Sequence, residues 1–320
     1  MKSVGSRIVI WVILFAYQKN IIQLSLVNYL VSITKRLPTN VVGEFFVDSS
    51  CINCDTCREV APSVFEESEG YSFVVKQPQT EFEILQTKQA VFSCPSGSIG
   101  SVNGFDRAEI RETFPLKISD NVYYNGFNSP NSFGAKSYFI DDKNGNWMID
   151  SPKYSKLLVN KFEELGGLDY IFLTHRDDVA HADKFAYKFG AKRIIHYFDR
   201  SVQRDAEIII KGIDPVEIEP GFTIIPTPGH TKGHCVLLYN NKFLFTGDHL
   251  YWRSDIKSLR ATRNYCWWNW EEQVKSMERL KQYKFSWILP GHGHRKYFEE
   301  NDMKIHFNKF YKKMSDPNYW

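Results

Sequence analysis

The stretch PTPGHTKGH (226–234) begins where an apolar, strand-like run ends. Three other stretches share this placement, each at the end of a predicted strand: TH (174–175), FTGDH (245–249) and LPGHG (289–293). Metal sites are often built at such places, because strand ends fix the backbone while loops let side chains converge. The sequence therefore predicts a metal site formed by four loops at one edge of a β-structure.

Taken together and in this order, the four stretches resemble the metallo-β-lactamase superfamily, and TPGHTKGH is especially similar to glyoxalase II and its relatives. The resemblance covers roughly residues 121–300 and implies a four-layer αβ/βα sandwich. It also implies metal ligands at matching positions. These are the first histidine of the family's H-x-H-x-D-H loop, the histidine of the next motif, a carboxylate that bridges two metals and a last histidine on the second metal: His175, His230, Asp248 and His292.

The stretch HRDDVAHAD (175–183) departs from the family pattern. Asp177 stands where the family has its second histidine, and Asp178 followed by valine stands where it has Asp-His. A longer loop could deliver Asp177 or Asp178 to the first metal, and His181 or Asp183 to the second. Alternatively, Asp177 or Asp178 caps the helix that follows, and His181 has no metal role. One metal position is thus expected from the motifs, while the second stays open.

A second motif, CINCDTC (51–57), places three cysteines at every third position, and Cys94-Pro95 follows later. Three closely spaced thiolates and a distant Cys-Pro suit an iron–sulfur cubane, whereas a zinc Cys₄ site usually uses two separated C-x-x-C pairs. Residues 43–105 resemble the single-cluster bacterial-type ferredoxins. The resemblance implies a [4Fe–4S] cluster, because the middle ligand is present, held by Cys51, Cys54, Cys57 and Cys94.

The 320-residue chain is therefore predicted to be an α+β protein with a small ferredoxin-like domain (38–113) followed by the sandwich (114–320). Residues 1–37 form an apolar and basic segment that we expect to lie outside the fold. Its continuous apolar run, IVIWVILFAY (8–17), is too short to span a bilayer of about 30 Å, so we do not expect membrane attachment.

A net charge of +3 is too small for this length to indicate nucleic-acid binding. Closely spaced metal-binding cysteines indicate a reducing compartment, the cytoplasm or the stroma of an organelle.

Within this frame the sequence favours a hydrolase. The resemblance implies that a hydroxide on one or two zinc or iron ions attacks a small thioester, ester or lactone. His234 and His249 would orient ligands or contact the substrate.

Two alternatives remain. His175, His230 and Asp248 form the two-histidine, one-carboxylate set of mononuclear iron oxidoreductases, which resembles the persulfide dioxygenases of this superfamily. The chain could instead be a catalytically inactive electron-transfer or redox-sensing protein. An electron donor or acceptor protein would be its partner in either case.

Overall fold

The computed structural model describes residues 33–316, 318 and 319. Most of the predicted N-terminal segment (1–37) lies outside these described residues. Its last part does not lie outside the fold, because the backbone N–H of Leu37 donates to Val47 (3.0 Å) and that of Ser49 donates to Lys35 (2.9 Å). The N-terminal unit thus includes residues before position 38. Among the described residues, no helix is both long enough and apolar enough to cross a membrane.

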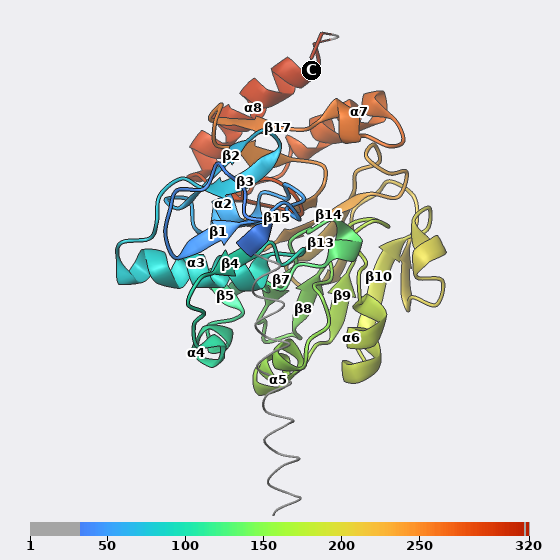
Figure 1. Cartoon of the computed structure of the whole chain (residues 1–320). Helices are drawn as coiled ribbons and strands as arrows, with labels where there is room; N and C mark the ends of the chain where they lie inside the picture. The colour runs from blue at the N-terminus through green and yellow to red at the C-terminus, as the bar shows by residue number, and fades with distance from the viewer. Residues whose placement is uncertain (1–32, 317, 320) are drawn as a thin grey trace, which may run out of the picture.

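Within the described residues, the N-terminal unit contains two small two-stranded antiparallel sheets and three helices, drawn in blue to cyan in Figure 1. Its longest helix, α3, starts with a reciprocal capping pair in which Thr80 and Glu83 bind each other's backbone N–H groups. The elements of the unit, in chain order, are β1 (Phe45–Val47), α2 (Thr56–Val60), β2 (Phe65–Ser68), β3 (Tyr71–Val74), α3 (Glu81–Ser93), β4 (Ile99–Ser101) and α4 (Arg107–Glu112).

The rest of the chain forms two large sheets. The first is seven-stranded, in the order β11-β10-β9-β8-β7-β6-β5, and the second is six-stranded, in the order β12-β13-β14-β15-β18-β19. The strands of the first sheet are β5 (Leu116–Ser119), β6 (Val122–Tyr124), β7 (Tyr138–Ile140), β8 (Trp147–Ile149), β9 (Tyr170–Phe172), β10 (Lys192–His196) and β11 (Ile208–Ile210). Those of the second are β12 (Val216–Glu219), β13 (Phe222–Pro226), β14 (Cys235–Tyr239), β15 (Phe243–Gly247), β18 (Trp287–Pro290) and β19 (Lys296–Tyr297).

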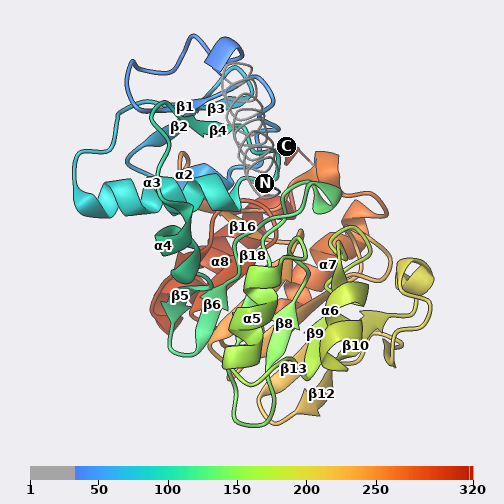
Figure 2. The same ribbon diagram turned by 60° about the horizontal axis from the view of Figure 1, so that its bottom comes forward.

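Helices cover the outer face of each sheet. Helices α5 (Lys156–Glu164) and α6 (Ala182–Phe189) pack on the first sheet, as Figure 2 shows. Helices α7 (Trp270–Leu280) and α8 (Glu300–Met314) pack on the second. A short hairpin of β16 (Tyr251–Arg253) and β17 (Ser258–Arg260) follows β15.

The inner faces of the two sheets meet in one hydrophobic core. Trp147 of β8 stacks on Phe222 of β13 with ring centroids 4.4 Å apart, which joins the sheets face to face. The strands alternate an inward residue with one facing a helix, since Met148 packs beside α5 while its neighbour Trp147 enters the inner core. The predicted α+β, four-layer sandwich is confirmed.

The four metal-site stretches all follow strands, as predicted. His175 follows β9, His230 follows β13, Asp248 directly follows β15 and His292 follows β18. Because β15 and β18 are parallel neighbours, their ends place Asp248 and His292 at the same edge of the second sheet.

Candidate metal centre and cluster site

Two groups of side chains that suit a metal ion occur among the described residues. The first contains His175, His230 and Asp248, and the second contains Asp178, Asp248 and His292. Within each group, the ligand atoms all lie within 4.8 Å of one another. Asp248 belongs to both, because its Oδ2 is 3.8 Å from His175 Nε2, 3.7 Å from His230 Nε2 and 3.8 Å from His292 Nε2. The structure thus provides two adjacent metal positions that share one carboxylate.

The ring of His175 is oriented from behind by a hydrogen-bond chain. Its Nδ1 is 3.0 Å from the hydroxyl of Thr174, and that hydroxyl also lies 3.0 Å from the carboxylate of Asp150. This leaves Nε2 directed at the first position. Burial lowers the pKa of His175 to about 4, so the ring is neutral near pH 7 and able to bind a metal.

The second position is closed on one side by a glycine. A Cβ on Gly291 would lie 2.8 Å from Asp248 Oδ1 and 2.9 Å from Asp178 Oδ2, so a larger residue there would displace both carboxylates. Burial, and then the nearby charge of Asp248, raises the pKa of Asp178 well above its usual value. Two buried carboxylates this close repel each other unless a proton or a cation compensates them.

Buried polar atoms without protein hydrogen-bond partners gather at the metal positions. Among the described residues, His175 Nε2, His230 Nε2, Asp178 Oδ2 and Asp248 Oδ1 are buried and have no hydrogen-bond partner. Buried polar atoms are nearly always satisfied, so four such atoms in one place call for a ligand. The residues therefore fit one or two metal ions.

The unusual HRDD loop contributes to both positions, but not through the residues expected for the second. Asp177 Oδ2 lies 3.7 Å from both His175 Nε2 and His230 Nε2, beside the first position. Asp178, which we had assigned to the first metal or to a cap, lies in the second group instead. His181 joins neither group. It occupies the N-cap position of α6, and its Nδ1 accepts a hydrogen bond from the backbone N–H of Tyr154 at 3.2 Å.

His234 and His249 lie behind the first position, buried and stacked with ring centroids 4.5 Å apart. The Nδ1 of His234 is 2.9 Å from the hydroxyl of Thr227, and its ring centroid is 5.3 Å from that of His175. Neither ring belongs to a metal group among the described residues. Their place fits the predicted supporting role better than substrate contact.

The four predicted cluster cysteines belong to the N-terminal unit. Cys54 precedes helix α2, Cys57 lies within it, and Cys94 is the C-cap of α3. Burial raises the pKa of the Cys57 thiol, and the nearby thiols of Cys54 and Cys94 raise it further. Cys57 is buried, and Cys51, Cys54 and Cys94 are partly buried. Four cysteines within one small unit suit iron, which binds the deprotonated thiolates.

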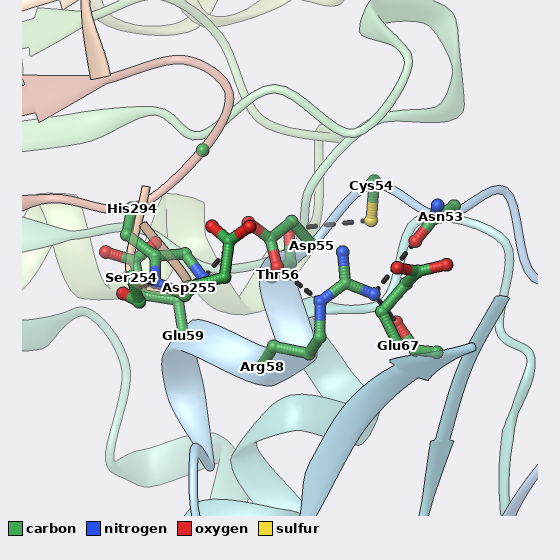
Figure 3. Close-up of polar contacts among 12 residues, drawn as sticks. Asn53, Cys54, Asp55, Thr56, Arg58, Glu59, Glu67, Ser254, Asp255 and His294 are labelled. Carbon is green, nitrogen blue, oxygen red and sulfur yellow. Dashed lines mark hydrogen bonds and ion pairs between the residues drawn. The ribbon is translucent and has the colours of Figure 1, made fainter. Parts of the chain in front are cut away.

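One cavity of about 1540 Å³ is lined by both halves of the molecule. Cys54 and Asp55 form part of its wall, and His230, Asp248 and His292 form another part. Figure 3 shows the loop of Cys54 and Asp55 beside His294, which follows His292 closely in the chain. No motif of the sequence indicates that the two units share a cavity.

Two tryptophans at or just before the start of helix α7 have different surroundings. Trp267 lines the cavity, is 59% exposed and lies 6.1 Å from the ring of His230. Trp270 instead packs against the second sheet's helical layer and stacks on Tyr319 at 5.7 Å.

Comparison with protein families agrees with this geometry. Residues 133–292, half of the chain, match the metallo-beta-lactamase superfamily, and residues 47–101 match the 4Fe-4S single cluster domain of ferredoxin I. The chain therefore belongs to the metallo-β-lactamase superfamily and carries a ferredoxin-type [4Fe–4S] domain in addition. The family resemblances seen in the sequence are thus confirmed.

Individual relatives are more distant. The uncharacterized protein YobT of Bacillus subtilis (strain 168) is 29% identical over 198 residues, which cover 51% of this chain and 85% of YobT. An archaeal metallo-beta-lactamase superfamily protein from Sulfolobus tokodaii has 18% identity and a TM-score of 0.43, covering 63% of this chain and 88% of its own. ETHE1 from Myxococcus xanthus has 18% identity and a TM-score of 0.43, covering 61% and 91%. None of these proteins assigns a substrate to this chain.

Proposed function

We propose that the chain is a metal-dependent oxidoreductase in which the iron–sulfur cluster and the metal centre exchange electrons. The observation that carries this proposal is the shared cavity, whose wall contains both Cys54 and the side chains of His230, Asp248 and His292. A hydrolase has no evident use for an electron carrier in the wall of its own active-site cavity. The shared cavity therefore supports an oxidoreductase over the hydrolase that the sequence motifs favoured.

The donor set supports the same conclusion. The two positions offer three imidazoles and two buried or partly buried carboxylates, and Asp177 adds a third carboxylate beside the first position. Carboxylate ligands shift preference from zinc towards harder ions, and a two-histidine, one-carboxylate face with open positions is typical of iron(II) oxidoreductases. Iron bound there would supply one-electron redox chemistry.

In this scheme a donor protein is oxidised by one electron, and that electron reduces the cluster. A small-molecule oxidant bound in the cavity finally accepts the electron and is reduced. The chain's own residues bind the two centres and hold them against one cavity. Trp267, exposed at the rim, would provide an apolar wall for the substrate.

The test compares anaerobic protein whose metal centre is loaded with iron(III) or with zinc. The cluster is reduced with dithionite, and its EPR signal is followed by rapid freezing. With iron we expect the signal of the reduced cluster to decay while the ferric signal disappears, and with zinc we expect it to persist. Equal persistence with both metals, or protein that takes up zinc alone, would argue against the proposal.

The second candidate is a hydrolase acting on a small thioester, ester or lactone. It is favoured by the sharing of Asp248 between two adjacent positions, the arrangement of two-metal hydrolytic sites. Metal ions there would acidify a water and polarise the substrate carbonyl. Zinc-loaded protein that hydrolyses thioesters at the same rate with the cluster oxidised or reduced would favour this candidate. A chain that binds no metal outside its cluster would instead be an inactive electron carrier.

A further inference from the structure

Helix α2 of the N-terminal unit contacts the loop that carries His292. The helix contains Cys57 and follows Cys54, so it holds part of the predicted cluster site. Asp55, at its N-cap, has its Oδ2 3.0 Å from His294 Nε2. Glu59, near the end of the helix, accepts a hydrogen bond from the backbone N–H of Arg295 at 2.8 Å. In Figure 3, Asp55 and His294 point toward each other across the boundary of the two units.

Lys136 of the sandwich also binds the His292 loop (291–295). The backbone N–H of Lys136 donates to the carbonyl of Gly291 (2.8 Å), and the ammonium group of Lys136 donates to the carbonyl of Gly293 (2.6 Å). These two contacts flank His292 on either side. The ammonium group also lies 3.2 Å from Glu59 Oε2, so helix α2 and the loop share one buried cation.

The contact between helix α2 and the His292 loop is largely buried. The side chain of Lys136 is 1% exposed and that of Glu59 is 7% exposed. Arg295 Nε lies 3.1 Å from the other carboxylate oxygen of Glu59, so two cations compensate one carboxylate. Burial acts to raise the pKa of Glu59, but Lys136 and Arg295 together hold it below its usual value. The carboxylate is thus ionised and fixed in orientation by both partners.

We infer that Asp55 and Glu59 are positioning residues for His292, so that the helix carrying cluster ligands also sets the second metal position. Through His294, Arg295 and Lys136 they fix the backbone on both sides of His292. This places its ring against Asp248, the carboxylate common to both positions. Occupation of the second position therefore depends on the N-terminal unit, while the first position does not. The inference rests on the second metal position and holds for either proposed reaction.

The test measures binding of Mn²⁺ alone to protein that keeps its oxidised, EPR-silent cluster but has been stripped of other metal. The EPR signal of free Mn²⁺ gives the binding isotherm, and the coupled signal of two neighbouring ions reports the filled second position. We expect Glu59→Gln and Asp55→Asn to weaken the second equivalent by about tenfold or more, as loss of supporting contacts to metal ligands usually does. The first equivalent should bind as in the wild type, and the coupled signal should diminish.

Glu109→Gln is the matched control, because Glu109 is an exposed glutamate on helix α4 of the same unit. It should leave both equivalents unchanged. The inference is overturned if both variants keep the cluster's visible absorption and bind the second equivalent as tightly as the wild type. Equal weakening of both equivalents also overturns it. Should Glu59→Gln fail to fold, Asp55→Asn decides, since the side chain of Asp55 is 24% exposed and its loss leaves less charge buried. A wild type that binds only one Mn²⁺ would refute this inference and leave the proposed electron exchange standing.

Discussion

Gly134 of the sandwich lies directly against Cys54 of the N-terminal unit. A Cβ on Gly134 would be 2.9 Å from Cys54 Cβ, 3.2 Å from its Sγ and 2.8 Å from Pro95 Cγ. The neighbouring residue, Phe133, has its ring centroid 6.4 Å from that of His292. A two-residue segment thus separates a predicted cluster ligand from a predicted metal ligand, and in the proposed oxidoreductase it would give an electron a short route between the two sites.

Gly134→Ala should destabilise the cluster. Gly134 has a φ of +85°, where a residue with a Cβ costs about 1 kcal/mol, and the new methyl group would also press on Cys54. We expect iron content to fall and the cluster absorption to bleach faster in air. Gly104→Ala is the control, because Gly104 has a φ of +70° but no described atom within 4 Å of an added Cβ. Similar bleaching rates for the two variants would mean that the contact with Cys54 is unimportant.

Asp177→His should shift metal preference towards zinc. Asp177 Oδ2 lies 3.7 Å from the Nε2 atoms of His175 and His230, so a histidine there would replace an oxygen donor by a nitrogen donor. Imidazole suits zinc well, whereas carboxylate favours harder ions. Protein offered equal iron(II) and zinc under anaerobic conditions should then retain a larger share of zinc, measured by elemental analysis. Asp183→His, on the exposed side of α6, should leave the ratio as in the wild type. An unchanged ratio in both variants would remove Asp177 from the site.

The fold was predictable because its signals are local. Each metal-site stretch is a strand end followed by glycine, histidine or aspartate, and the cysteine spacing is complete within a short segment. The HRDD loop could not be predicted in detail. Asp177 and Asp178 are neighbours in the sequence, and the path of the loop backbone decides which metal position each carboxylate approaches. The two roles left open for His181 could not be distinguished for the same reason; its Nδ1 accepts a hydrogen bond from the backbone N–H of Tyr154, and it joins neither metal group.

The contact between the two units was invisible in the sequence. Arg295 of the sandwich and Glu59 of the N-terminal unit are 236 positions apart. Neither residue belongs to one of the motifs, and neither does His294. Charge complementarity between distant loops becomes apparent only when the fold brings them together.

Lys136→Met should destabilise the protein by about 3 kcal/mol, because removing one partner of a buried ion pair leaves the other charge uncompensated. The effect is moderated by Arg295, which keeps one bond to Glu59. Thermal unfolding followed by circular dichroism measures the loss. The double variant Lys136→Met/Glu59→Gln should recover part of it, since no buried anion then remains at this point. A double variant no more stable than Lys136→Met would contradict the ion-pair explanation.

His230→Ala should remove metal from the first position while leaving the cluster in place. The Nε2 of His230 is buried without a hydrogen-bond partner among the described residues, and it lies 3.7 Å from both Asp177 and Asp248. The fold around it depends on its backbone instead, since its carbonyl accepts hydrogen bonds from Trp267 (2.9 Å) and Trp268 (3.1 Å). Alanine keeps these bonds and loses only the ring.

For this variant, elemental analysis should show less metal per chain, and the visible absorption of the cluster should match the wild type. His306→Ala is a suitable control, because that half-buried ring stacks on Phe298 at 4.1 Å and belongs to neither metal group. It should retain both the metal and the cluster. If His230→Ala lost its cluster while His306→Ala kept it, the first metal position would support the N-terminal unit. The dependence of the two sites would then run in both directions, because His230 lies in the sandwich and the four predicted cluster cysteines lie in the N-terminal unit.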